Sequence, residues 1–228
     1  MIQLPREPIA ALNRVRLREN GEPLVEIAND LKVLREFAVP FVREGVAKRL
    51  NDASKNLPPK YRIGLREGWR SIERQKFVYD RYFEKLKREN PNASYATLRR
   101  MTNRFYAPYD QKAPPGHSTG GAVDVWLLDE NGEPIDLHGE GDRFANAPTF
   151  RAGLPKEIVE GRRMLFDAMI AAGFTNCRDE WWHYSYGDAA WAVRLNKTEC
   201  PYGFAPLPEN LYRDKDEAFI ADVIAREG

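Results

Sequence analysis

The chain contains three histidines, and two of them stand close to carboxylate residues. His117 opens the segment HSTGGAVDV, in which Asp124 follows seven residues later. His183 closes the segment EWWH, which begins at Glu180. Asp124 interrupts an otherwise apolar run, so its charge needs a partner if the run is buried, and a metal ion is one such partner.

Two imidazoles and one carboxylate are typical ligands of a catalytic zinc ion, which uses about three protein ligands and leaves one position for water. Zinc lowers the pKa of that water toward about 7, and a nearby glutamate that is not a ligand can accept its proton. The residue types also allow a plainer interpretation. His117 is then a loop histidine, Asp124 a turn or salt-bridge residue, and EWWH an edge strand, and spacing alone leaves both open.

Local patterns predict the elements that carry these residues. We expect strands at 22–28, 63–69, 122–128 and 180–186, with a turn at Asn131-Gly132. We expect helices after Pro40, after Ser71, after Asn92 or Ser94, from Pro155 to Gly173, and over 214–226. On a regular strand, Glu180 and His183 would point to opposite faces. If the two act together, the backbone there is irregular or the strand begins after Glu180.

Helices and strands are mixed without regular alternation. This pattern predicts an α+β fold, with a mainly antiparallel central sheet and flanking helices. The length of 228 residues suits one well-buried core, so we expect a single domain over 1–228.

The formal net charge is +1, which predicts neither a nucleic-acid partner nor a polybasic membrane signal. No apolar segment has the length of a signal peptide core or of a membrane span, so we expect a cytoplasmic protein. Cys177 and Cys200 do not make a disulfide framework, and we expect two thiols.

The motif pair HSTGGAVDV and, about 55 residues later, EWWHY resembles the signature of zinc-dependent D-alanyl-D-alanine dipeptidases, which are related to zinc D,D-carboxypeptidases and to the hedgehog domain. The likeness covers about residues 22–186, and 187–228 would be a C-terminal extension. It implies a hedgehog/D,D-peptidase-like fold with one zinc per chain. The implied ligands are His117, Asp124 and His183, with Glu180 as the general base.

The resemblance also implies substrate-binding residues. GWRS is similar to a family segment whose arginine stabilises the transition state, which indicates Arg70. Asp142 matches a family aspartate that binds the substrate's amino group, with Glu140 as a second candidate. Trp181 and Trp182 are expected to pack in the core, and Trp182 also to form a wall of the substrate pocket. His138, in the same loop as Asp142, is expected to be solvated.

Two positions depart from the family pattern: Pro115 stands where a serine is usual, and Ser71 where a proline is usual. We expect these two departures to affect how the substrate fits the site more than how the metal ion is bound. We therefore expect hydrolysis of D-Ala-D-Ala or a similar small dipeptide. The alternatives are a carboxypeptidase or endopeptidase acting on peptidoglycan stem peptides, and a zinc-binding module without turnover. Glu180 and Arg70 argue against the last, because a purely structural zinc site needs neither.

Overall fold

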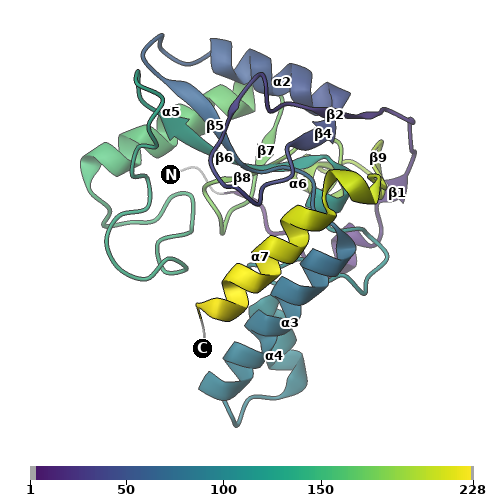
Figure 1. The fold of residues 1–228 in the computed structure, drawn as a ribbon. Helices are drawn as coiled ribbons and strands as arrows, with labels where there is room; N and C mark the ends of the chain where they lie inside the picture. Colours follow the sequence, from purple (N-terminus) through teal and green to yellow (C-terminus); the bar gives the residue numbers. More distant parts are fainter. Residues whose placement is uncertain (1–3, 227–228) are drawn as a thin grey trace.

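A five-stranded sheet runs through the centre of the computed structural model, which describes residues 4–226 (Figure 1). The strand order is β3 (Lys32–Val33), β5 (Arg62–Glu67), β6 (Ala122–Leu128), β8 (His183–Ser185) and β7 (Thr175–Asn176). β3 and β5 run parallel, whereas the three following neighbour pairs are antiparallel. The sheet is therefore mixed, where the sequence predicts a mainly antiparallel one.

Two small strand pairs lie beside this sheet. β2 (Leu24–Glu26) pairs antiparallel with β4 (Phe41–Arg43). β1 (Arg16–Leu17) pairs parallel with β9 (Glu199–Cys200), so the segment after residue 187 is joined to the N-terminal part of the chain.

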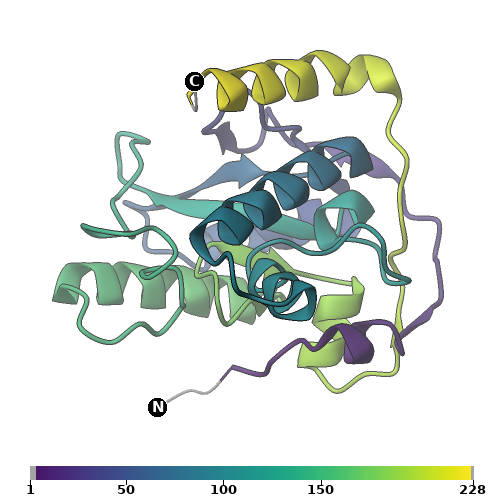
Figure 2. The same cartoon turned by 90° about the horizontal axis from the view of Figure 1, so that it is seen from below.

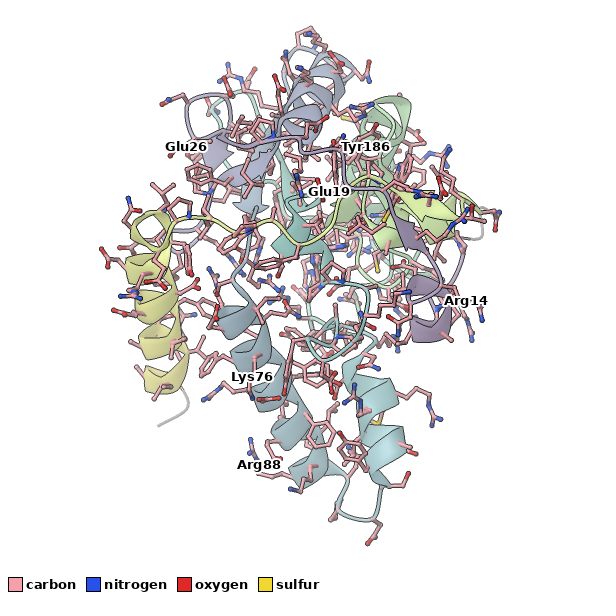
Figure 3. All side chains as sticks on the ribbon, turned by 90° about the vertical axis from the view of Figure 1, so that its right-hand side faces the viewer. Arg14, Glu19, Glu26, Lys76, Arg88 and Tyr186 are labelled. Atoms are coloured by element: carbon pink, nitrogen blue, oxygen red, sulfur yellow. The ribbon has the colours of Figure 1, made fainter. Side chains whose placement is uncertain are left out.

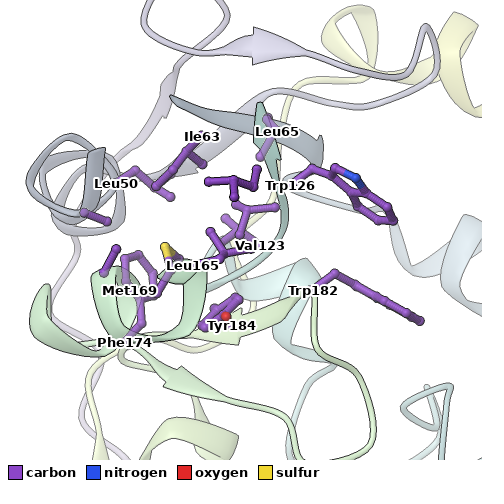
Figure 4. Close-up of a cluster of buried hydrophobic side chains, with 14 of the residues drawn as sticks. Leu50, Ile63, Leu65, Val123, Trp126, Leu165, Met169, Phe174, Trp182 and Tyr184 are labelled. Atoms are coloured by element: carbon purple, nitrogen blue, oxygen red, sulfur yellow. The ribbon is translucent and has the colours of Figure 1, made fainter. Parts of the chain in front are cut away.

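One face of the sheet is covered by α2 (Glu44–Lys55) and α5 (Lys156–Ala171), which also pack against each other. The apolar side chains between these layers form the main core (Figure 4), and they include Leu50, Ile63, Leu65, Val123, Leu165, Met169, Phe174 and Tyr184. Side chains alternate between the faces of a strand. In β6, Val123 and Val125 therefore face this core, and Asp124 faces the other side.

The remaining long helices lie on the side of the sheet away from α2 and α5 (Figures 1 and 2). They are α3 (Ile72–Glu89), α4 (Tyr95–Thr102) and α7 (Arg213–Ala225), and α3 contacts both of the others. Ser71 and Ser94 cap α3 and α4, since each hydroxyl accepts a backbone N–H from the first turn. Charged side chains such as Lys76 and Arg88 project outward from α3 (Figure 3). The short helical turns are α1 (Ile9–Leu12), η1 (Gly116–Thr119), α6 (Ala189–Arg194) and η2 (Glu209–Leu211).

Two of the differences between the predicted and observed bounds have a clear structural reason. The helix expected directly after Pro40 begins only at Glu44, because residues 41–43 pair with β2 as a strand. The strand expected over 180–186 is limited to His183–Ser185, because the chain turns at Trp181 and Trp182. Both cysteines are free thiols, as predicted. Within residues 4–226, no helix is long and apolar enough to cross a membrane.

Candidate active site

The fold brings together the three predicted metal ligands from three separate segments. His117 lies in η1, Asp124 in the middle of β6, and His183 at the start of β8. Antiparallel pairing sets Asp124 directly opposite His183, and His183 Nδ1 lies 3.0 Å from Asp124 Oδ1. His117 Nε2 lies 3.4 Å from the same oxygen. The three potential ligand atoms all lie within 4.8 Å of one another.

A glycine turn directs His117 toward the sheet. Gly120 ends η1 with a φ of 70°, a left-handed conformation that glycine adopts without strain. A Cβ atom at this position would lie 2.4 Å from a methyl group of Leu24. The turn therefore needs glycine for its backbone conformation and for the space, and it connects His117 to the start of β6.

A backbone carbonyl fixes the orientation of the His117 ring. His117 Nδ1 lies 2.8 Å from the carbonyl oxygen of Gly68, which can only accept a hydrogen bond. Nδ1 therefore carries a proton, which leaves Nε2, the ring nitrogen that lies nearest Asp124, as the atom that could bind a metal ion. The end of β5 is tied to this turn twice more: the N–H of Arg70 donates to the carbonyl of His117, and the hydroxyl of Ser118 donates to the carbonyl of Arg70.

The Asp124 carboxylate is held between the two imidazoles. Burial acts to raise its pKa, but the neighbouring charges and hydrogen bonds of His117 and His183 hold the pKa of Asp124 well below its usual range. Asp124 is therefore an anion in this environment, and an ionised carboxylate is the form that binds a metal ion.

Glu180 lies in the tight turn that precedes β8. The N–H of His183 donates to the carbonyl of Glu180, and β8 begins only at His183. The irregular backbone allows both side chains to line the same cavity, which a regular strand would prevent. Burial, together with the charge of Asp124, raises the pKa of Glu180 to about 7. A carboxyl group with such a pKa can both accept and return a proton near neutral pH.

Arg70 follows an irregularity in β5. The register shifts between Leu65 and Glu67, so Glu67 pairs with Asp124 and faces the site side of the sheet. Arg70 Nη1 donates to Gln75 at 2.9 Å, and Nη2 lies 3.4 Å from Glu67. Burial acts to lower its pKa, but the carboxylates of Glu67 and Asp124 raise the pKa of Arg70 overall. The Nε atom is buried without a hydrogen-bond partner.

One large cavity of about 1400 Å³ connects these groups, and its lining includes Arg70, His117, Asp124, Glu180, Trp182 and His183. Trp182 is 2% exposed, and its ring projects away from the main core (Figure 4). Trp181 is also buried but does not line the cavity.

The loop after β6 differs from expectation. Asp142 is exposed, its carboxylate accepts the N–H of Ala145 at 2.7 Å, and the neighbouring Arg143 lines the cavity instead. A role of Asp142 or Glu140 in binding an amino group stays a prediction. His138 is not solvated as expected. It is half-buried, and its ring lies 5.8 Å from that of Trp182.

Several residues near the site carry no recognisable sequence signal. Glu67 and Asp216 hold Arg74 behind Arg70, and Arg35 and Arg143 reach the cavity from distant loops. Glu67 lies three residues before Arg70, and this spacing is a local signal that the two side chains can form an ion pair. The others depend on contacts between segments far apart in the sequence.

Comparison with known proteins identifies relatives. A family model described as D-Ala-D-Ala dipeptidase matches residues 71–201, which is more than half of the chain. The D-alanyl-D-alanine dipeptidase of Synechocystis is 30% identical over 216 residues, covering 84% of this chain and 86% of that protein. The D-alanyl-D-alanine dipeptidase of Escherichia coli is 26% identical over 117 residues, covering 51% and 57%.

Two solved structures are also similar. VanYB in complex with D-alanine-D-alanine has a TM-score of 0.46 at 16% identity, covering 82% of this chain and 93% of that one. The LdcB LD-carboxypeptidase has a TM-score of 0.43 at 19% identity, covering 85% and 89%. Similarity at this level carries no weight for function, whereas the family model and the Synechocystis relative do. On these two matches, the chain belongs to the D-Ala-D-Ala dipeptidase family of peptidases.

Proposed function

We propose that this protein is a zinc-dependent dipeptidase that hydrolyses D-Ala-D-Ala or a similar small dipeptide. The observation that carries the proposal is the convergence of His117, Asp124 and His183 on one cavity that Glu180 and Arg70 also line. Family membership supports the same reaction class.

The donor set fits zinc. Two nitrogen donors and one carboxylate oxygen match a catalytic site that keeps one position open. The hydrogen bond from His117 Nδ1 to Gly68 leaves Nε2 as the donor atom, which is the neutral form that a metal ion requires. A zinc ion bound there would polarise the scissile carbonyl and acidify the attacking water.

Glu180 is the proposed general base. Its carboxylate accepts a proton from the attacking water and then delivers that proton to the nitrogen of the leaving residue. A pKa of about 7, raised by burial, suits both steps near neutral pH.

Arg70 is the proposed electrostatic partner of the carbonyl oxygen. Gln75 and Glu67 hold its two terminal nitrogens, so the guanidinium group is oriented before substrate binds. A fixed cation stabilises the negative charge that develops on that oxygen without reorganisation. Trp182 would form an apolar wall beside the substrate, and Asp142 remains a proposed partner of its amino group on the family resemblance.

A second candidate function is supported by the size of the cavity. A volume of about 1400 Å³ exceeds the range of roughly 300–1,000 Å³ that is typical of small-molecule pockets. It leaves room for a substrate longer than a dipeptide, as a D,D-carboxypeptidase acting on stem peptides would require.

The deciding experiment is a substrate panel with zinc-loaded protein. It compares D-Ala-D-Ala, L-Ala-L-Ala, N-acetyl-D-Ala-D-Ala and a stem pentapeptide ending in D-Ala-D-Ala. We expect efficient hydrolysis of D-Ala-D-Ala alone. Equal hydrolysis of the N-acetyl dipeptide or of the pentapeptide would favour the carboxypeptidase, and no hydrolysis of any member would reject both.

A further inference from the structure

The turn that carries Glu180 is held by a buried asparagine of the neighbouring strand. Asn176 is the last residue of β7 and is 2% exposed. Its Nδ2 atom lies 3.0 Å from the carbonyl oxygen of His183, 3.3 Å from that of Trp181 and 3.4 Å from that of Glu180. One side-chain amide therefore connects both ends of the turn between Glu180 and His183.

A buried threonine fixes the orientation of this amide. The three carbonyl oxygens on one side of Asn176 can only accept hydrogen bonds, so the NH2 group faces them and Oδ1 faces the other way. There the Thr149 hydroxyl lies 2.6 Å from Oδ1 and 2.9 Å from the carbonyl oxygen of Cys177, and Thr149 is 3% exposed. The donors and the acceptor of the amide are thus all engaged.

The loop after β6 fixes the position of Thr149. The N–H of Thr149 donates to the carbonyl of Arg178, and the N–H of Trp181 donates to the carbonyl of Ala147. The buried guanidinium group of Arg162 in α5 donates to three further carbonyls of this loop, those of Leu137, Asn146 and Pro148. The contact between the loop and the Glu180 turn is therefore anchored to a long helix.

The Glu180 carboxylate depends on this turn for its position. It forms no hydrogen bond or ion pair of its own with any residue from 4 to 226. His183, in contrast, is also held by strand pairing, because it lies opposite Asp124 of β6. A change in the turn should therefore move Glu180 more than it moves His183.

Neither Asn176 nor Thr149 lines the cavity, so neither is placed to touch a substrate. We propose that both are positioning residues, which act through Glu180 by fixing the turn from which its carboxylate reaches the cavity. This inference rests on the proposed function, because it takes Glu180 as the general base. A displacement of about 1 Å can cost on the order of 100-fold in rate.

Steady-state kinetics of zinc-loaded variants with D-Ala-D-Ala test the proposal. Asn176→Asp keeps the size of the side chain but sets an oxygen against the three carbonyls. We expect kcat to fall on the order of 100-fold, KM to change less than about threefold, and the zinc content to stay the same. Thr149→Val is milder and should lower kcat about tenfold, whereas Thr149→Ser keeps the hydroxyl and should retain most of the parent's kcat.

Thr102→Val is the matched control. Thr102 is fully buried, its hydroxyl donates to the carbonyl of Leu98 at 2.9 Å, and it does not line the cavity. This variant loses a buried hydroxyl, as Thr149→Val does, but should keep the kcat of the parent. An equal fall of kcat in the two variants would reduce the role of Thr149 to fold stability and overturn the proposal.

A double-mutant cycle shows whether Asn176 acts through Glu180. On a Glu180→Gln background the base is already lost, so adding Asn176→Asp should lower kcat by less than about threefold more. A further loss as large as the one in the parent would mean that Asn176 acts through another group, and the proposal would be wrong.

Hydrogen exchange examines the turn without turnover. The N–H of His183 donates to the carbonyl of Glu180. This amide should exchange at least about tenfold faster in Asn176→Asp and Thr149→Val, but not in Thr102→Val. If the parent hydrolyses no peptide while this amide responds as expected, the proposed reaction fails and the fixation of the turn is upheld. If the parent hydrolyses D-Ala-D-Ala and both variants keep its kcat, the proposed function stands and the positioning role is rejected.

Discussion

His117 and His183 reach the site by different means. His183 is fixed by strand pairing, because the antiparallel register of β6 and β8 sets it opposite Asp124. His117 lies on a turn, and the carbonyl of Gly68 holds its ring. A Cβ atom at Gly68 would come within 2.6 Å of the carbonyl oxygen of Val39, so this position has room only for glycine. Second-sphere contacts of this kind orient a metal-binding imidazole as much as its own strand or turn does.

Glu180→Gln separates catalysis from metal binding. The amide keeps the shape of the side chain but cannot accept the proton from water. We expect kcat to fall by about 10²–10⁴-fold, with the zinc content unchanged, because a general base contributes about that much. Elemental analysis and steady-state kinetics on the same preparation check both statements. Loss of zinc in this variant would instead identify Glu180 as a ligand.

Arg70→Ala should affect the chemical step more than substrate binding. Loss of one fixed donor to a developing oxyanion costs on the order of 3 kcal/mol, which corresponds to roughly 100-fold in kcat. We expect KM to change much less, because the interaction forms mainly in the transition state. Steady-state kinetics of the variant and the parent provide the comparison. An effect of Arg70→Ala on KM alone would make Arg70 a ground-state binding residue.

At the scale of elements, the end of β5 holds Arg70 in place through a buried network of ion pairs and hydrogen bonds. Glu67, turned to the site side by the register shift, pairs with Arg70 and with the fully buried Arg74. Arg74 also contacts Asp216 of α7, and the Ser71 hydroxyl donates to the same carboxylate. The C-terminal helix is therefore connected through hydrogen bonds to the segment that carries Arg70.

Asp216→Ala tests this connection. The change leaves Arg74 and Ser71 without one buried charged partner, and the loss of such a hydrogen bond costs about 1.5–3 kcal/mol. We expect a lower free energy of unfolding by this amount, measured by urea denaturation, together with a lower kcat. Glu217→Ala, at an exposed position of the same helix, is the control and should change neither. Equal stability of the two variants would contradict a structural role for the contact.

The sequence predicts those elements that have local causes. The apolar run of β6 matches its prediction at 122–128, and the hydroxyls of Ser71 and Ser94 cap helices where expected. The two-residue strands β3 and β7 have no such signal, because they exist only through pairing with β5 and β8. For the same reason, the sequence does not predict that Arg35 and Arg143 line the cavity, because their positions depend on how distant loops fold together.

At the scale of the molecule, the three proposed metal ligands join parts of the chain that are far apart in the sequence. His117 precedes β6, whereas His183 lies beyond the whole loop and helix α5 that follow it. β1 and β9 connect the ends of the described region in a similar way. These long-range contacts lead us to predict that the chain unfolds as one cooperative domain, with the extension after residue 187 included.

Zinc should therefore stabilise the whole fold and not only its site. An ion that binds the folded state alone stabilises it by about 2.7 kcal/mol at a free concentration of 100 times its Kd. For a chain of this size, that corresponds to an increase in Tm of roughly 5–10 °C. Differential scanning calorimetry of chelator-treated protein, with and without added zinc, measures the shift. Glu180→Gln should show the full increase, because it keeps every ligand, whereas His183→Ala should show little or none. If His183→Ala gains as much stability from zinc as the parent does, the ion binds elsewhere, and the assignment of His117, Asp124 and His183 as its ligands is wrong.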